Sequence, residues 1–192
     1  MMKIRCVLFS MLFVLDFSGS FQAQTYYTLK EAGTIDKDSV RYLNLSKKKL
    51  ETLPELVFSF ENLRGLDLSK NRFVSLPEKL QKLEHLEVLD LSRNRFEIFP
   101  TIINDLPNLK TLYLGRNNLG YIPRNISKCQ KLEYLDMYDN PLSDIGAGLS
   151  LIPTLKTLDL RGLMYNAKRQ AELKGKLEGV EVLFDAPCNC MD

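Results

Sequence analysis

Histidine is almost missing from this chain, which has a single one, His85, among its 192 residues. Nucleophilic and general-base centres commonly depend on a histidine beside a serine, cysteine or carboxylate. His85 instead stands at a turn position just before an apolar segment. The chain also lacks a glycine-rich phosphate loop ahead of a helix and a paired-histidine metal motif. We therefore interpret His85 as a solvated turn residue and expect a protein that is not an enzyme, with no catalytic residue, no metal and no cofactor.

A large excess of charge of one sign is missing too. The chain has 26 basic and 24 acidic residues, which gives a net charge of +2. Proteins that bind nucleic acid usually neutralise its phosphates with a strongly basic surface. The near-balance of charge argues against a nucleic-acid partner.

No apolar run is long enough to cross a bilayer as a helix, which takes about 20 residues. The longest run, Cys6 to Leu15, follows a short positively charged start and is followed by small and polar residues. This order is typical of a secretory signal peptide. We predict that residues 1–23 are a signal peptide cleaved between Ser20 and Gln24. The protein is then exported, to the periplasm, the cell surface or the medium, with no transmembrane segment; an uncleaved interfacial anchor is the alternative.

Cysteine is too scarce for a disulfide framework. Without Cys6 the chain keeps three cysteines, an odd number, although export would permit disulfides. Cys129 fills a slot that large apolar residues fill elsewhere, so we interpret it as a small buried hydrophobe. Cys188 and Cys190 allow two interpretations: thiols that take a metal or a partner's cysteine, or an ordinary tail.

The chain does contain a regular internal repeat. Its units of 23 residues start at Val40, Leu63, Leu86, Leu109, Leu132 and Leu155. The second unit begins LRGLDLSKNRFVSLP and the third LEVLDLSRNRFEIFP. Within the second, Leu66 and Leu68 alternate with polar neighbours, which is the period of a half-buried strand. Successive units can therefore stack their strands into a parallel sheet.

The pattern L-x-x-L-x-L-x-x-N-x-L, followed by Leu-Pro, resembles the leucine-rich-repeat family and its 23-residue subclass, found in many bacterial members. The resemblance covers 40–165. It implies an α/β fold, a leucine-rich-repeat solenoid: a curved right-handed coil with a parallel sheet on its concave face and short helical or irregular turns on its convex face.

Two further apolar columns are expected to fill the convex side of the core. One consists of Val57, Leu80, Ile103, Ile126 and Leu149, and the other of Phe60, Leu83, Leu106, Cys129 and Ile152. Neither column can be enclosed by one unit alone, whereas stacked neighbours can bury both.

A column of asparagines marks the point where the chain leaves each strand. An amide side chain both donates and accepts, so it can bridge backbone groups of consecutive turns that have lost their sheet partners. We predict a structural ladder of Asn71, Asn94, Asn117 and Asn140. Lys48 and Leu163 replace asparagine in the first and last units, as is typical of capping units.

Both ends of the solenoid are expected to be capped. The N-terminal cap covers 24–39, with a short helix from Thr28 to Ala32. The C-terminal cap covers 166–184, with a helix over 166–178 and a strand over 180–184. Residues 185–192 are expected to form a loose tail.

The outward-facing residues of the strands are the candidate binding surface. The second and third units carry Asp-Leu-Ser there, the ordinary filler of the family, so departures from it are more informative. Exposed tyrosines are enriched at interfaces. We predict a partner-binding patch of Tyr113, Tyr134 and Tyr138 with Arg93, Arg116, Asp90, Asp136 and Asp139. Tyrosines that pack on one another and merely cover the sheet are the alternative.

Together with the predicted signal peptide, the resemblance indicates an exported interaction module of bacterial type with a protein partner of unknown identity, which we expect to be a monomer. Two alternatives stay open. One is a structural or self-associating component of the cell envelope. The other is an intracellular signalling adaptor, if the N-terminus is not a signal peptide.

Overall fold

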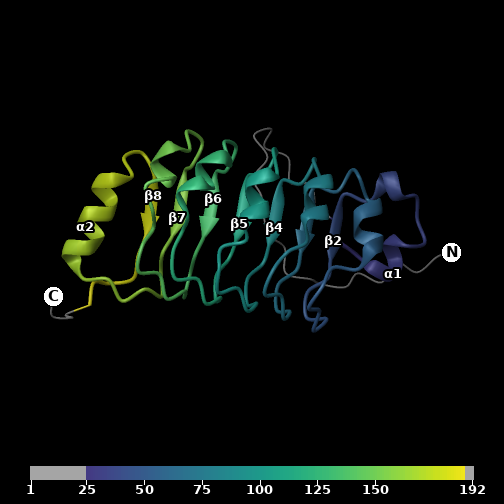
Figure 1. The fold of residues 1–192 in the computed structure, drawn as a ribbon, viewed down its shortest axis with the longest axis horizontal. Helices are drawn as coiled ribbons and strands as arrows, with labels where there is room; N and C mark the ends of the chain where they lie inside the picture. Colours follow the sequence, from purple (N-terminus) through teal and green to yellow (C-terminus); the bar gives the residue numbers. More distant parts are fainter. Residues whose placement is uncertain (1–24, 189–192) are drawn as a thin grey trace.

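The computed structural model describes residues 25–188, which form one parallel sheet with short helical turns along its other side (Figure 1). The eight strands follow one another in sequence order. They are β1 (Tyr27–Thr28), β2 (Tyr42–Asn44), β3 (Gly65–Asp67), β4 (Val88–Asp90), β5 (Thr111–Tyr113), β6 (Tyr134–Asp136), β7 (Thr157–Asp159) and β8 (Glu181–Leu183). The fold is the predicted open solenoid.

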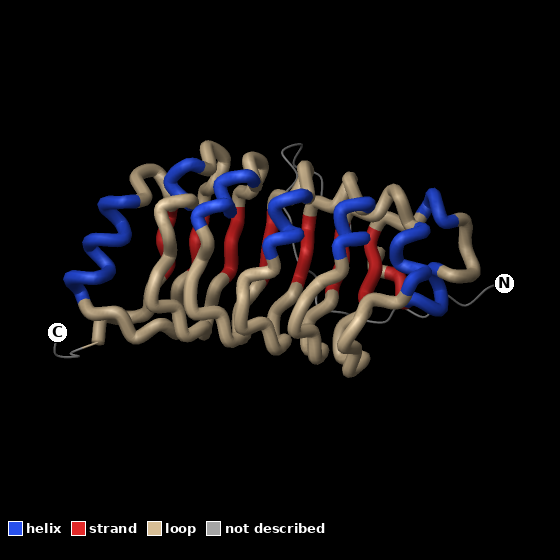
Figure 2. The backbone as a smooth tube through the Cα atoms, viewed as in Figure 1, coloured by secondary structure: helices blue, strands red, loops and turns tan. Residues whose placement is uncertain are grey.

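Helical turns form a second row opposite the strands (Figure 2). The α-helices are α1 (Leu29–Ala32) and α2 (Ala167–Lys176). The 3-10 helices are η1 (Lys37–Ser39), η2 (Glu55–Ser59), η3 (Glu78–Lys82), η4 (Thr101–Asp105), η5 (Arg124–Lys128) and η6 (Leu149–Leu151).

The strand register has the 23-residue step of the sequence repeat. Leu66 pairs with Leu89, Leu89 with Leu112, and Leu112 with Leu135. These leucines are at most 1% exposed, so they form one interior row. The two convex columns expected from the sequence are buried as well, including Cys129.

Proline begins four of the helical turns on the convex side. Pro54, Pro77, Pro100 and Pro123 are the N-caps of η2 to η5, where proline's fixed φ suits the turn. The fifth unit has Gly146 in this slot, with φ +59°, and its turn η6 is shorter. A Cβ on Gly146 would lie 2.4 Å from the carbonyl oxygen of Ile122, so the close packing of these units requires glycine.

The asparagine column bridges consecutive units through its amides. Asn117 Oδ1 accepts from the backbone N–H of Phe96, 3.2 Å away. Its Nδ2 donates to the carbonyl oxygens of Leu91 and Leu114, at 3.1 and 2.8 Å. The same three-way arrangement recurs at Asn71, Asn94 and Asn140.

The N-terminal cap contains the expected helix and a strand that was not expected. Thr28 and Glu31 form a capping box at the start of α1. The two residues of β1 pair with β2, so the sheet ends on this side in a very short edge strand.

At the C-terminal end, β8 pairs with β7 and α2 begins at its N-cap, Asn166. Residues 185–188, the described part of the segment predicted as a tail, form hydrogen bonds with the last unit. The Asp185 carboxylate accepts from the backbone N–H of Gly162 at 2.6 Å, and the N–H of Cys188 donates to Tyr165. These hydrogen bonds attach the segment to the last unit.

Cys188 is also disulfide-bonded, and Cys190 lies outside the described residues.

Replacing Asn117 by alanine should destabilise the fold, because it leaves buried backbone groups of two units without partners. We expect the free energy of unfolding to fall by about 3 kcal/mol, measured by urea denaturation. Asn118 is exposed, so Asn118→Ala is the matched control and should cost less than about 0.5 kcal/mol. Equal losses in the two variants would contradict the structural role of the column.

Candidate binding surface on the concave sheet

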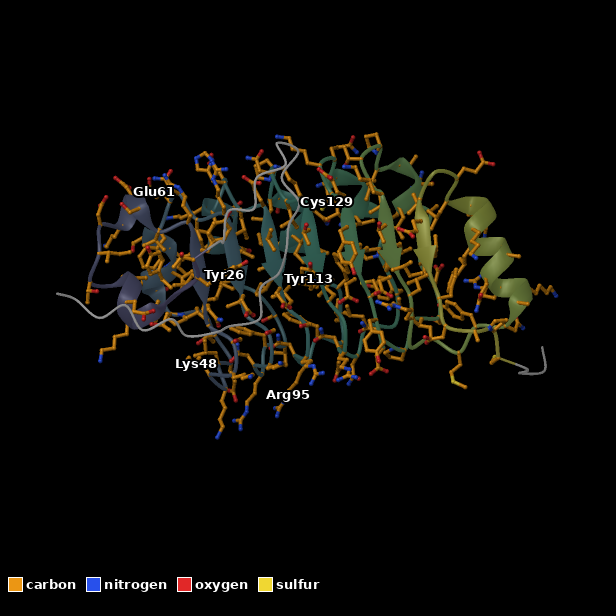
Figure 3. All side chains as sticks on the ribbon, turned by 180° about the vertical axis from the view of Figure 1, so that it is seen from behind. Tyr26, Lys48, Glu61, Arg95, Tyr113 and Cys129 are labelled. Carbon is orange, nitrogen blue, oxygen red and sulfur yellow. The ribbon has the colours of Figure 1, made fainter. Side chains whose placement is uncertain are left out.

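The concave face is built from the strand residues that alternate with the buried leucines. Because side chains of a strand point alternately to its two faces, two residues of each three-residue strand face outward. Figure 3 looks onto this face, with Tyr26 and Tyr113 over the sheet, Lys48 and Arg95 at one edge and Glu61 at the opposite edge.

A column of aspartates runs down this face, and local backbone bonds hold each carboxylate. Asp67, Asp90, Asp136 and Asp159 each accept from the backbone N–H two residues ahead, at 2.7 to 3.1 Å. Such turns stabilise the chain where it leaves the strand. Asp90 and Asp136, which the sequence placed in the partner-binding patch, therefore also have a structural role.

Asp136 stands out electrostatically among these acids. Its carboxylate lies over Gly115, where a Cβ would come within 2.9 Å of Asp136 Oδ2. Burial is the main reason why the pKa of Asp136 is raised to about 6, and the negative charges of Asp159 and Asp90 add to the effect. Asp136 therefore changes charge around pH 6.

Tyr113 and Tyr134 lie beside Asp136 on adjacent strands and pack on one another. Their ring centroids are 5.4 Å apart, with the planes inclined by 48°, a geometry favourable for aromatic pairs. Burial raises the pKa of both phenols, to about 12 for Tyr134. Both hydroxyls therefore stay protonated at neutral pH and available as hydrogen-bond donors.

Tyr138 contacts an arginine at the edge of the sheet. The guanidinium of Arg116 lies 5.3 Å from the centroid of the Tyr138 ring, within the range of a cation–π contact. Arg116 Nε is also 3.4 Å from Asp139 Oδ2. The predicted patch thus has two parts, the Tyr113–Tyr134 pair and the Tyr138–Arg116–Asp139 group, with exposed Arg93 on the rim one unit before Arg116.

A second aromatic pair, which the sequence reasoning missed, lies nearer the N-terminal end of the concave face. The rings of Tyr26 and Tyr42 are 5.2 Å apart. They cover Gly65, where a Cβ would lie 2.5 Å from the Tyr42 ring and 3.1 Å from the Tyr26 hydroxyl. The other units carry larger residues at the position of Gly65. This glycine was the one feature of the sequence that could have indicated the pair.

His85 and Cys129, two of the side chains that sequence reasoning considered for chemistry, are not arranged for it. His85 is exposed on its turn. Burial raises the pKa of the Cys129 thiol to about 12, which keeps it from forming the reactive thiolate. Within residues 25–188, no three potential metal-ligating side chains gather in one place. What the face offers is aromatic, acidic and basic groups for recognition.

Comparison with known proteins agrees with this architecture. The family described as a leucine-rich repeat region matches residues 57–181. No curated protein matches the chain. None of the described helices is both long enough and apolar enough to span a bilayer.

Several solved structures are similar to the chain. A leucine-rich-repeat protein of Leptospira interrogans is 25% identical, with a TM-score of 0.65 over 86% of this chain and 49% of that one. Internalin C2 of Listeria monocytogenes is 22% identical, with a TM-score of 0.64 over 82% and 66%. The leucine-rich-repeat domain of APL1B is 27% identical, with a TM-score of 0.56 over 65% and 38%. The chain thus spans less than two thirds of each of these structures.

The raised pKa of Asp136 predicts a pH-dependent stability. A carboxyl whose pKa is higher in the folded state stabilises the fold when protonated. This contribution is complete below the ordinary value of 3.8 and is lost as the pH rises through about 6. Asp136→Asn imitates the neutral form and keeps an acceptor for Tyr138. At pH 8 it should be about 2–3 kcal/mol more stable than the natural chain.

The higher stability of Asp136→Asn should vanish near pH 4. Urea denaturation of both proteins between pH 4 and pH 8 measures it. Asp139→Asn is the matched control, because Asp139 is exposed, and it should leave the pH profile unchanged. A gain in Asp136→Asn that is the same at pH 4 and pH 8 would contradict the burial of this charge.

Proposed function

We propose that this chain, which belongs to the leucine-rich-repeat family, is an interaction module that binds a protein partner through its concave sheet. Leucine-rich-repeat folds commonly mediate protein–protein interaction and are typically binding scaffolds without enzyme activity. The partner and its binding site are specific to this chain and are argued from its own residues.

The observation that supports this proposal best is the aromatic content of units four and five. Tyr113 stands where four of the other units carry aspartate, and Tyr138 stands where the first three units carry serine. Tyr134 lies on the adjacent strand and packs on Tyr113. Half-buried tyrosines offer a rigid apolar face and a polar hydroxyl, and they lose little side-chain entropy on binding. This combination is typical of residues that contribute most to the affinity of an interface.

Charged groups surround the rings and would form the rim of the interface. Asp136 lies beside the tyrosine pair, Asp90 is one strand away, and Arg93, Arg116 and Asp139 stand at the exit of the strands. Charges at such a rim orient the partner more than they add affinity. The short edge strands of the sheet, β1 with two residues and β8 with three, support a monomer, because short edges offer few backbone groups for pairing with another copy.

Removing two of the rings should abolish partner capture. We expect Tyr113→Ala with Tyr138→Ala to lower the affinity by about 30-fold or more, since truncating hot-spot residues typically costs at least about 2 kcal/mol. The immobilised chain is used to capture partners from the exported fraction, and mass spectrometry identifies the proteins that the variant loses.

Tyr121 provides the matched control, because it is 47% exposed and lies outside the concave strands. Tyr121→Ala should keep full capture, and light scattering should show monomers for all three proteins. Capture by the double variant at the natural level would remove this patch from consideration.

Export of the protein is a second part of the proposal, supported by the charged start and the apolar run of residues 1–23. N-terminal sequencing of the protein from its natural source should give a chain that begins between Ser20 and Gln24. A protein that still begins at residue 1 or 2 would favour the intracellular adaptor instead.

A further inference from the structure

A ridge of cations lies along one side of the sheet, in the turns that follow the C-terminal ends of the strands. We call it the basic ridge and define it as Lys47, Lys48, Lys49, Lys70, Arg72, Arg93, Arg95 and Arg116. All eight are exposed, and Lys48 and Arg95 show the direction in which the ridge projects (Figure 3). The first units contribute most of it, next to the aromatic patch at Arg116.

Most of the ridge is not neutralised within the described part of the chain. Arg72 lies 3.7 Å from Glu51, and Arg116 lies 3.4 Å from Asp139. The other six cations form no ion pair with any residue in 25–188. An added anion could therefore pair with these cations without displacing a carboxylate of the described chain.

The opposite side of the sheet, where the strands begin, shows that unpaired positive charge is not a general property of the solenoid. There, in the column just before the strands, Arg64 and Lys110 both bind Glu87 at 3.1 and 2.8 Å. Lys156 likewise pairs with Glu133. One edge is therefore neutralised by its own neighbours, whereas the ridge keeps its positive charge.

The backbone gives no reason for cations on the ridge. Lys47, Lys70, Arg93 and Arg116 occupy equivalent positions with φ between 55° and 58°, a region that disfavours residues with a Cβ. The fifth unit has Asp139 in this slot, with φ +53°, and the last unit has Gly162, with φ +85°, so the conformation does not require a cation. Four consecutive units nevertheless carry a long basic side chain there, which a ligand outside the chain would explain.

We propose that the basic ridge docks an acidic, extended segment of the protein partner. This inference rests on the proposed function, because it takes the partner to be a protein. Equivalent cations follow one another at about 4.8 Å, so four units span about 15 Å, the length of four or five extended residues. The planar guanidinium group of an arginine can donate two parallel hydrogen bonds to the two oxygens of a carboxylate.

Two features favour a peptide over nucleic acid. The ridge is one narrow edge, which suits a single extended strand. The aspartate column lies next to it, so a phosphate backbone that spread from the ridge onto the sheet would meet Asp67 and Asp90. An acidic segment confined to the edge avoids this repulsion.

The test uses a fluorescein-labelled peptide of six consecutive aspartates, with a peptide of six asparagines as the uncharged control. We expect fluorescence anisotropy to show binding of the acidic peptide alone, weakening as salt shortens the electrostatic range below about 10 Å. Lys70→Asn with Arg93→Asn should bind about tenfold more weakly. Asparagine tolerates positive φ, so this variant should keep its thermal unfolding midpoint.

Lys82→Asn with Lys128→Asn is the matched control. It removes two exposed cations from the convex turns and should bind the peptide within about twofold of the natural chain. Equal binding by the ridge and control variants would overturn the proposal. So would a single-stranded DNA or a sulfated glycan that displaces the probe at lower concentration than unlabelled hexa-aspartate.

The Tyr113→Ala and Tyr138→Ala variant separates this inference from the proposed function. It should keep its affinity for the acidic peptide while it loses the partner. If the peptide fails to bind and the tyrosine variant still loses its partner, the ridge proposal is wrong and the concave-face proposal stands.

Discussion

The hydrogen bonds of the asparagine amides are the constraint on which the rest of the structure depends. Each amide joins the backbone of its own unit to that of the unit before, through bonds such as those from Asn117 to Leu91 and to Leu114. These bonds fix how one unit sits on the next, while the buried leucines supply the stabilisation, roughly 1.5–3 kcal/mol for each fully buried side chain. Because every unit takes the same step, the outward residues of all strands fall into straight columns.

Much of this could be predicted from the sequence, because a repeat shows the same pattern several times. The interior row from Leu66 to Leu135 and the buried slot of Cys129 both follow from the 23-residue spacing. Features that occur once could not be predicted in this way. The strand β1 has only two residues and therefore no period, and the docking of Asp185 onto Gly162 joins residues whose sequence carries no matching signal.

The same limit applies to the binding surface. Alternation along the strands correctly placed Tyr113 and Tyr134 on one face, and the structure adds that their rings pack together. The contact of Arg116 with Tyr138 depends on side-chain conformations that spacing does not specify. The face combines acids that serve the turns of the chain, tyrosines that depart from the repeat, and cations most of which form no ion pair within residues 25–188. The latter two groups distinguish this chain from the generic fold.

Hydrogen exchange of the backbone amides that bind the asparagine side chains tests the central claim most directly. The N–H groups of Phe73, Phe96 and Leu119 donate to Asn94, Asn117 and Asn140 and to no strand neighbour. If the amides join the units, these three N–H groups should exchange as slowly as those of the strand leucines, because both are released only when neighbouring units separate. Rapid exchange of all three beside protected strand amides would contradict the account.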